Sequence, residues 1–330
     1  MSKLVLGLDV GGTSSRAVTT TLDGTVVGRG AAGGGNPLAV PPDLAAAEVA
    51  RALADALAGT DPRRIAAAVL GLAGVSGFDR PDTSAAFQRV WNAAGLRCPV
   101  AAVGDAQVAF ASGTDEPLGT VLIAGTGSAA ARIDADRITR VGDGLGWLLG
   151  DKGSGFWIGR RAAADTAAHL QAGRPPTLLT ELVVRAVLGD DADETRTAGT
   201  SPDRAAGGPP PASDAFVIAV HQRPPRSLDR LAPLVTEAAL AGDEGAAAIL
   251  DEAAAHLAAA VANVRDPGET TPIVLSGSVL RGSAPVRDGV RTRLAAAWPG
   301  APVTQAGPAE LGAAKLAALS LQRPSTSPFS

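Results

Sequence analysis

The sequence is poor in the residues that build disulfide frameworks, zinc clusters and aromatic surfaces. Among 330 residues it has one cysteine, Cys98, and no tyrosine, and aromatic residues make up 3%. A single cysteine excludes an internal disulfide and a cysteine zinc cluster. The three histidines, His169, His221 and His256, share no metal-ligand spacing, so we interpret them as structural or solvated.

The sequence also lacks the features of membrane-spanning and nucleic-acid-binding proteins. No segment approaches the roughly 18 unbroken apolar residues that a membrane-spanning helix needs. The formal net charge of −4 is not the excess of positive charge that is typical of nucleic-acid-binding proteins. The N-terminus enters an apolar strand at once and contains no cleavage site. We therefore predict no signal peptide and expect a cytoplasmic location.

The most informative stretch that is present is LDVGGTSSRAV, residues 8–18. An apolar strand delivers Asp9 into a Gly-Gly turn, and a second strand follows. Bare N–H groups and hydroxyls in such a turn suit phosphate oxygens, and the preceding acid suits the magnesium that accompanies nucleotide phosphates. An ordinary glycine hairpin is the competing interpretation of this stretch alone. The predicted phosphate-binding residues of the turn are Gly11, Gly12, Thr13 and Ser14.

The same strand–turn–strand pattern occurs a second time. Residues 4–30 are predicted to form a three-stranded meander, and residues 118–141 repeat it. This duplication predicts two similar domains that face each other, and the chain length also suggests about two domains. Because the second turn takes the same place in the repeat, we favour a phosphate-binding role for it. Its residues are Gly125, Thr126, Gly127 and Ser128.

Hydrophobic periodicity predicts the remaining elements. The polar residues 190–213, rich in Gly and Pro, are predicted to be a mobile surface loop, and residues 323–330 a frayed end. Strands are expected over 65–72, 99–103 and 273–275. Helices are expected over 43–58, 85–94, from 106 onward, and over 155–171, 177–188, 227–266 and 311–321. In the first of these, the residues at helical spacing that predict the buried face are Leu44, Val49, Leu53 and Leu57.

Asp105 is the strongest candidate for chemistry. It closes a predicted strand and opens a predicted helix, whose N–H groups favour the ionised carboxylate. A lone Asp there would ordinarily be a helix cap. This one lies between two phosphate-type turns, and phosphoryl transfer needs an acid that accepts the proton of the acceptor hydroxyl. We therefore predict that Asp105 is the catalytic base.

Two further glycine-rich segments carry weaker signals. In residues 146–159, GWLLGDKGSGFWIG, the backbone around Asp151 can approach a polar ligand closely. Trp147 could stack on a sugar face or belong to the core. Gly277 and Ser278 follow a buried strand, where a nucleoside could lie flat across the turn.

In their order along the chain, six motifs resemble the BadF/BadG/BcrA/BcrD ATPase family, and more closely its N-acetylglucosamine and glucosamine kinases. The resemblance covers nearly the whole chain. It implies an α/β fold of two duplicated ribonuclease H-like, actin-like ATPase domains with an interdomain cleft. We expect an N-terminal domain over 1–117 and 309–330, and a C-terminal domain over 118–308. The motifs are LDVGGTSSRAV, GDAQVAF, IAGTGS, GWLLGDKGSG, IVLSGSVL and LGAAKLA.

The resemblance also implies residue roles. Asp9 would position Mg²⁺ through water, the two turns would hold the phosphates of ATP, and Gly277 and Ser278 would lie beside adenosine. Asp105 would be the base for the 6-hydroxyl of a sugar. The sugar would be surrounded by Asn36, Asp105, Thr126 and Asp151, with Gly146 and Trp147 at its rim.

Two positions depart from the family pattern beside the acceptor. Lys152 stands where the family commonly has Glu, and Gly104 replaces the usual Asn before the catalytic Asp. The sequence predicts an ATP-dependent kinase that phosphorylates an amino sugar at the 6-hydroxyl. Glucosamine is favoured because Asp105 and Asp151 could hold its ammonium group, and N-acetylglucosamine is the alternative.

Other function classes stay open with less support. An activator ATPase of the same family bridges an iron–sulfur cluster with cysteines from each subunit, and such clusters need thiolate ligands, whereas Cys98 is alone. A non-catalytic sugar sensor would not need Asp9, Asp105 and both turns. A zinc-dependent sugar kinase would need a cysteine cluster. The expected partners are a sugar and ATP, with no nucleic acid and no membrane, and a homodimer stays open.

Overall fold

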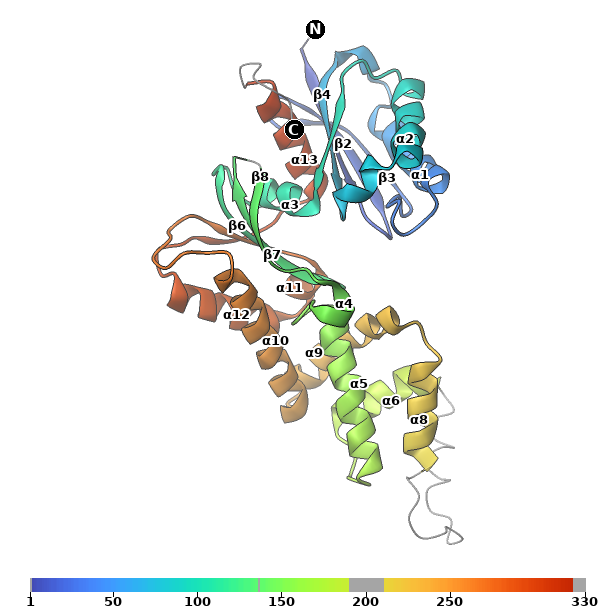
Figure 1. Cartoon of the computed structure of the whole chain (residues 1–330), viewed down its shortest axis with the longest axis vertical. Helices are drawn as coiled ribbons and strands as arrows, with labels where there is room; N and C mark the ends of the chain where they lie inside the picture. Colours follow the sequence, from blue (N-terminus) through green and yellow to red (C-terminus); the bar gives the residue numbers. More distant parts are fainter. Residues whose placement is uncertain (1, 136, 190–210, 323–330) are drawn as a thin grey trace.

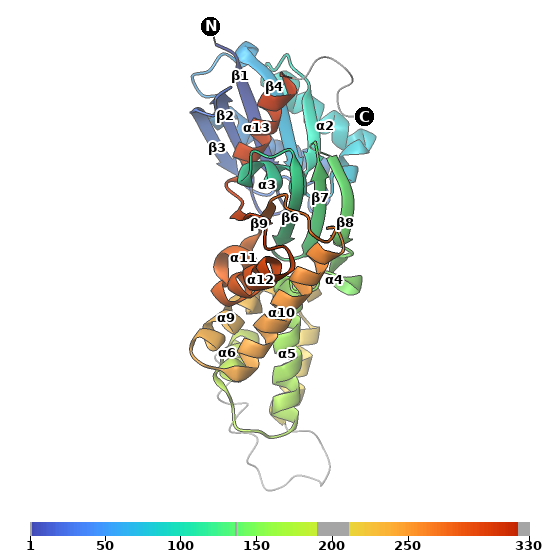
Figure 2. The ribbon, with the colours of Figure 1, turned by 90° about the vertical axis from the view of Figure 1, so that its left-hand side faces the viewer.

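The computed structural model describes residues 2–135, 137–189 and 211–322. Two five-stranded sheets organise these residues, and helices cover the sheets (Figures 1 and 2). The strand orders are β3-β2-β1-β4-β5 and β10-β9-β6-β7-β8. The predicted fold class of two similar α/β halves is confirmed at this level.

The first sheet combines an antiparallel meander with a parallel extension. β1 pairs antiparallel with β2, β2 pairs antiparallel with β3, and β4 and β5 run parallel to β1. Its elements are β1 (Leu4–Val10), β2 (Ser15–Thr21), β3 (Val26–Ala32), α1 (Pro42–Ala56), η1 (Pro62–Arg64), β4 (Ile65–Leu72), η2 (Val75–Asp79), α2 (Pro81–Ala93), β5 (Val100–Gly104) and α3 (Asp105–Gly113).

The second sheet repeats this plan, as the duplication predicts. β6, β7 and β8 form the antiparallel meander, and β9 and β10 extend it in parallel on the other side of β6. Its strands are β6 (Leu118–Ala124), β7 (Ser128–Asp134), β8 (Arg137–Asp143), β9 (Ile273–Ser276) and β10 (Val303–Gln305). Its helices are α4 (Gly146–Leu149), α5 (Gly155–Gln171), α6 (Leu178–Leu188), α8 (Pro211–His221), η5 (Pro225–Leu231), α9 (Ala232–Leu240), α10 (Glu244–Ala262), α11 (Ser278–Gly282) and α12 (Ala284–Ala297).

Helix α13 (Ala309–Ser320) returns the end of the chain to the first sheet, where it lies beside β1 and β4 (Figures 1 and 2). It approaches β1 so closely that a Cβ on Gly7 would lie 2.2 Å from the backbone oxygen of Glu310. Only glycine allows that contact at this point of the strand. The packing supports our proposal that the residues from 309 onward belong with residues 1–117.

The two faces of β1 explain the layered core of the first half. Alternate residues of a strand point to opposite faces. Leu6 and Leu8 therefore pack with α1 and α2, whereas Val5 packs with α3 and α13. In the second half, α10 runs through the largest apolar cluster. Among the described residues α10 alone is long and apolar enough to cross a membrane, and its buried Leu250 and Leu257 show that it is a core helix here.

Three predictions about the elements need correction. Leu44 was expected on the buried face of its helix but is 62% exposed, because Ala45, Val49 and Leu53 form that face. Residues 211–213 do not belong to a loop, because α8 begins at Pro211. The rest of that predicted loop, and the frayed end, lie outside the described residues.

The predicted helix over 227–266 is also not continuous. It consists of η5, α9 and α10, and its last residues lie beyond the end of α10 at Ala262. The break before α10 falls at Gly242, whose φ of +94° no helix allows, and Asp243 then caps α10 by accepting the N–H of Ala246 at 2.9 Å. Strand β10 and helices α8 and α12 were not predicted.

Candidate active site

Two acids lie where the parallel strands of the first sheet end. Asp9 is the penultimate residue of β1, and Asp105 begins α3 directly after β5. Burial raises the pKa of Asp9 to about 6, and the negative charges of Glu310 and Asp105 add to this effect. Burial also raises the pKa of Asp105, whose carboxylate accepts the backbone N–H of Ala106 at 2.9 Å. Asp9, the predicted metal-binding residue, and Asp105, the predicted catalytic base, are therefore close enough for the charge of Asp105 to affect the pKa of Asp9.

The GDAQ motif has a local structural reason. The side-chain oxygen of Gln107 accepts the backbone N–H of Gly104 at 2.8 Å, which fixes the chain just before Asp105. A Cβ on Gly104 would lie only 3.2 Å from that oxygen. The glycine that replaces the family's Asn at this position leaves room for the Gln107 oxygen close to the backbone.

The first glycine turn is held mainly by backbone. The Gly11 N–H donates to the Ser14 carbonyl at 2.9 Å, and the Gly11 carbonyl accepts N–H groups from Gly35 and Asn36. A Cβ on Gly34 would lie 2.1 Å from the Gly12 backbone oxygen, so the loop after β3 packs directly against the turn. Gly12 and Thr13 stay exposed, as a phosphate-binding turn requires.

Asn36 is buried beside this turn, and its side chain is tied to the backbone. Its amide nitrogen donates to the Ala73 carbonyl at 3.0 Å, and its amide oxygen accepts the Leu38 N–H at 2.9 Å. The side chain therefore joins the loop after β3 to the end of β4. Sugar binding by Asn36 remains a proposal in addition to this structural role.

The second turn is held by side chains from distant segments. The Asp151 carboxylate accepts the Ser128 N–H at 3.1 Å, and the Ser128 hydroxyl donates to the Lys152 carbonyl at 2.9 Å. A Cβ on Gly127 would lie 2.9 Å from the Asp151 carboxylate, so glycine is needed there. The structure thus joins two of the predicted motifs, the turn that begins at Gly125 and the segment around Asp151.

Asp151 is held in an uncommon backbone conformation. Its φ is +54°, in the left-handed region that few residues other than glycine adopt, and its N–H donates to the Asp143 carboxylate at 2.8 Å. Burial and the charge of Asp143 raise the pKa of Asp151, while the Ser128 N–H and the positive charge of Arg226 lower it. The Lys152 side chain is exposed.

Trp147 lies on the short helix α4 that begins at Gly146, and its indole is 40% exposed. Its ring makes an edge contact with Phe156 at 5.5 Å between centroids. The exposure removes the alternative that Trp147 is a core residue. It leaves the ring available for the predicted stacking at the sugar rim.

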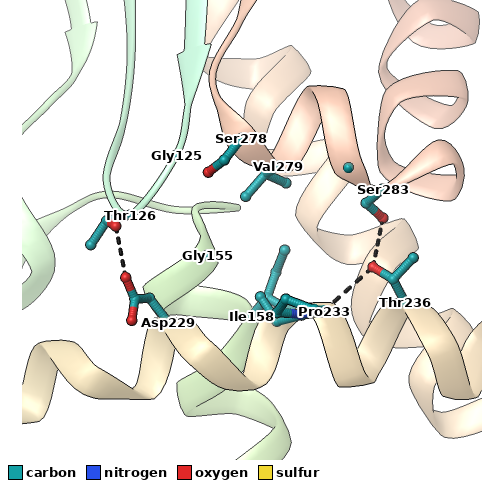
Figure 3. A pocket seen from close by; sticks show the side chains of 12 residues that line it. Gly125, Thr126, Gly155, Ile158, Asp229, Pro233, Thr236, Ser278, Val279 and Ser283 are labelled. Atoms are coloured by element: carbon teal, nitrogen blue, oxygen red, sulfur yellow. Dashed lines mark hydrogen bonds between the residues drawn. The ribbon is translucent and has the colours of Figure 1, made fainter. Parts of the chain in front are cut away.

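A cavity of about 150 Å³ lies beside the second turn (Figure 3). Gly125 and Thr126 form one side of it, and Ser278 lies at the start of α11 on another. Its apolar wall comes from Ile158, Pro233 and Val279. Pockets that enclose whole small molecules measure roughly 300–1,000 Å³, so this cavity has room for one part of a ligand, such as a nucleobase, and not for a whole nucleotide.

Gly277, the residue before Ser278, has a backbone that requires glycine. Its φ is +103°, and a Cβ there would lie 2.1 Å from the Ala124 carbonyl oxygen. The two motifs predicted to bind the nucleotide, at residues 125–128 and 277–278, are therefore neighbours in the fold.

Hydrogen-bonded side-chain pairs stand at two ends of the cavity (Figure 3). The Thr126 hydroxyl donates to the Asp229 carboxylate at 2.7 Å, and the Thr236 hydroxyl donates to the Ser283 hydroxyl at 2.9 Å. Sequence reasoning missed Asp229, Thr236 and Ser283. Asp229 and Thr236 lie on helical segments, and Ser283 lies between α11 and α12, so no strand end or phosphate-type turn marks them.

The arrangement fits a nucleotide with a divalent cation. The described residues contain no group of three or more His, Cys, Asp or Glu side chains that could hold a metal. Magnesium commonly binds proteins through one or two carboxylates and takes its other ligands from water and substrate phosphates. Asp9 fits this pattern, because its buried carboxylate lies near the negative charges of Glu310 and Asp105, whose repulsion a cation would relieve and which Arg16 and Arg281 offset only in part.

Comparison with solved structures identifies the fold. A candidate N-acetylglucosamine kinase from Chromobacterium violaceum has a TM-score of 0.70 and 26% identity, and the match covers 96% of this chain and 99% of that chain. A ROK family glucokinase from Streptomyces griseus, solved with glucose and AMPPNP, has a TM-score of 0.55 and 19% identity, and the match covers 97% and 100%. The fold is that of actin-like ATPases, with two ribonuclease H-like domains.

The family follows from the sequence. The profile of the BadF/BadG/BcrA/BcrD ATPase family matches residues 6–317, and the chain belongs to this family. This confirms the resemblance that the motifs indicate.

Two characterised relatives match over part of their length. An N-acetyl-D-glucosamine kinase of Dictyostelium discoideum is 30% identical over 194 residues, which are 56% of this chain and 60% of that protein. An N-acetylmuramic acid/N-acetylglucosamine kinase of Clostridium acetobutylicum is 30% identical over 167 residues, 48% of this chain and 52% of that protein. The matched region thus spans a little more than half of each relative.

Proposed function

We propose that this protein is an ATP-dependent kinase that phosphorylates the 6-hydroxyl of an amino sugar in the cytoplasm. One observation carries the proposal: Asp9 and Asp105 lie at one edge of the first sheet, each with a raised pKa, and Asp9 leads directly into an exposed glycine turn. The kinase relatives and the cavity beside the second turn support it.

In this mechanism each half of the chain has its own task. N–H groups of the two turns bind the phosphates of ATP. The adenine ring of ATP lies in the cavity between the second turn and α11. Asp9 would hold Mg²⁺ through water. Bound Mg²⁺ supplies neutralisation of the phosphate charge. Asp105 accepts the proton of the 6-hydroxyl, and the raised pKa of its carboxyl makes it a better proton acceptor than an exposed carboxylate.

Glucosamine is our favoured acceptor. Near neutral pH it carries an ammonium for much of the time, and a site that recognises this charge needs a carboxylate near the sugar's 2-position. Asp151 supplies one that is partly buried and fixed by Ser128 and Asp143. Lys152 is exposed, and it is not among the charges that shift the pKa of Asp151.

N-acetylglucosamine is the second candidate, and different observations favour it. Both characterised relatives act on this sugar by name. The acetyl methyl needs an apolar surface, which the exposed Trp147 and its neighbour Leu148 offer beside the Asp151 segment. The activator ATPase gains no such support, because Cys98 packs against the apolar core of the first half.

The direct test is ATP turnover by the purified protein with a panel of glucosamine, N-acetylglucosamine, glucose and N-acetylmuramic acid. We expect ADP release that depends on an amino sugar, with glucosamine the best substrate. Equal turnover with and without every sugar would contradict the kinase proposal.

A further inference from the structure

The Thr126–Asp229 pair has a chemical consequence for ligand binding. A threonine hydroxyl has one proton to donate and two lone pairs to accept with, and an ionised carboxylate only accepts. The Thr126 hydroxyl donates its proton to Asp229 Oδ2 at 2.7 Å. Thr126 Oγ1 can therefore only accept a hydrogen bond from a ligand.

A phosphate oxygen is a poor partner for this group. Phosphate oxygens of ATP also act as acceptors, and the Asp229 carboxylate adds a negative charge beside them. A ligand hydroxyl, by contrast, can donate to Thr126 Oγ1 or to Asp229. The phosphates would then be bound by the backbone N–H groups of the second turn rather than by the Thr126 hydroxyl.

The position of Asp229 is well fixed. It lies on η5, whose Leu228 and Leu231 are buried in the core of the second half. η5 packs so closely on α5 that a Cβ on Gly159 would lie 1.8 Å from the Leu228 carbonyl oxygen. Asp229 and Thr126 also both line the cavity in which Ser278 and Val279 face them (Figure 3).

We propose that Asp229 is a positioning residue that turns Thr126 into a hydrogen-bond acceptor, so that the pair recognises a hydroxyl group of the bound ligand. This inference rests on the proposed function. Because the pair lines the cavity beside the second turn, we expect the hydroxyl to belong to the ribose of the nucleotide. A hydroxyl of the amino sugar is the other source of the same chemistry.

The test compares ligands that differ by one hydroxyl. For the full chain, kcat and KM are measured with ATP, 2′-deoxy-ATP and 3′-deoxy-ATP, and with the amino sugar and its 3-deoxy and 4-deoxy forms. The variants are Asp229→Ala, Asp229→Asn, Thr126→Val and Thr126→Ser. Asp251→Ala is the matched control, because Asp251 pairs with Arg293 on the surface and lies outside the cavity.

We expect the wild type to prefer ATP over one deoxy-ATP by about tenfold or more, the size of a hydrogen bond that involves a charged group. Asp229→Ala and Thr126→Val should remove this preference, and the loss should appear in the KM for ATP more than in kcat. Asp229→Asn and Thr126→Ser keep an acceptor and a hydroxyl, so they should retain most of it. A variant that combines Asp229→Ala with Thr126→Val should discriminate between the ligands no less than the more impaired single variant, because both substitutions remove the same hydrogen-bonded pair.

The outcomes separate this inference from the proposed function. If Asp229→Ala and Thr126→Val lose discrimination against a deoxy-sugar but keep it against the deoxy-ATPs, the pair recognises a hydroxyl group, and that hydroxyl belongs to the sugar. Unchanged discrimination for all ligands in Asp229→Ala overturns the inference while the kinase proposal stands. A wild type that neither binds ATP nor phosphorylates a sugar overturns both. A uniform loss for every ligand, with a lowered Tm, also overturns it, since this shows a merely structural role.

Discussion

The two glycine turns occupy equivalent places in two equivalent sheets, yet they are stabilised in different ways. The first turn, after β1, is fixed by backbone hydrogen bonds to the adjoining loop, and its acid, Asp9, is part of the strand itself. The second turn, after β6, has Ile123 at the matching position of the strand and takes its acids from elsewhere. Asp151 holds the Ser128 N–H, and Asp229 holds the Thr126 hydroxyl.

This difference shows that the two halves of the duplicated fold use their acidic side chains in different ways. The first half carries Asp9 and Asp105 at the ends of its own strands, which suits the proton transfer and the metal ion that we propose. The second half uses acids to shape its own turn and thereby builds a cavity for part of a ligand. Substitutions in the first half should therefore affect chemistry, and substitutions in the second half should affect recognition.

The largest effect should come from the base of the first half. Asp105→Asn should lower kcat by about 10²–10⁴-fold, because general-base catalysis contributes that much, while the Kd values for sugar and nucleotide stay nearly unchanged. Steady-state kinetics and calorimetric titration measure the two effects. Asp82→Asn, an exposed residue of α2, is the control. Full activity of Asp105→Asn would remove this residue from the mechanism.

The second prediction concerns the stability of the ligand-free first half. The pKa of Asp9 rises from 3.8 to about 6 on folding, so the folded state favours the protonated form. The ionised carboxylate destabilises the fold increasingly as pH rises from 3.8, and fully above about 6, by about 3 kcal/mol. Asp9→Asn should therefore lose activity yet gain about this much free energy of unfolding at pH 7.5.

At pH 4 the same substitution should have almost no effect on stability. Urea unfolding of both proteins at the two pH values, with a chelator present, measures the difference. An Asp9→Asn variant that is less stable than the wild type at pH 7.5 would refute this account of the buried charge.

A comparable effect is expected on recognition by the second half. The wild type should prefer glucosamine over N-acetylglucosamine by at least about a hundredfold in kcat/KM, which corresponds to roughly 2.7 kcal/mol. Asp151→Asn should reduce this ratio sharply by removing the partner of the ammonium. Comparable efficiency of the wild type on both sugars would end the glucosamine preference and leave the amino-sugar kinase proposal standing.

The smallest effect should come from residues 190–210, which lie outside the described residues. Their sequence is rich in Gly, Pro and charge, and segments of such composition have little apolar surface to bury. A variant in which they are replaced by a short Gly-Ser linker, with α8 left intact from Pro211, should keep kcat within a few-fold of the wild type. A collapse of turnover would show that this segment takes part in the reaction.

The same contrast explains how much the sequence could predict. The strands and the first turn follow from local patterns, since Asp9, the glycines and the alternating apolar residues lie next to one another in the chain. Asp229 lies 103 residues from Thr126, and its position on η5 is set by packing against α5. Periodicity also misassigned Leu44, because its neighbour Ala45 joins Val49 and Leu53 on the buried face of α1 instead. Tertiary packing decides such cases, and no local pattern reports it.

The central claim is that the acids of the first half and the cavity of the second half serve one phosphoryl transfer. Phosphorus NMR of the protein with ATP, Mg²⁺ and glucosamine tests it most directly. The account predicts a sugar 6-phosphate resonance that grows at the same rate as ADP, and that is absent for Asp105→Asn. Formation of ADP and inorganic phosphate without any sugar phosphate would contradict it, because the protein would then be an ATPase.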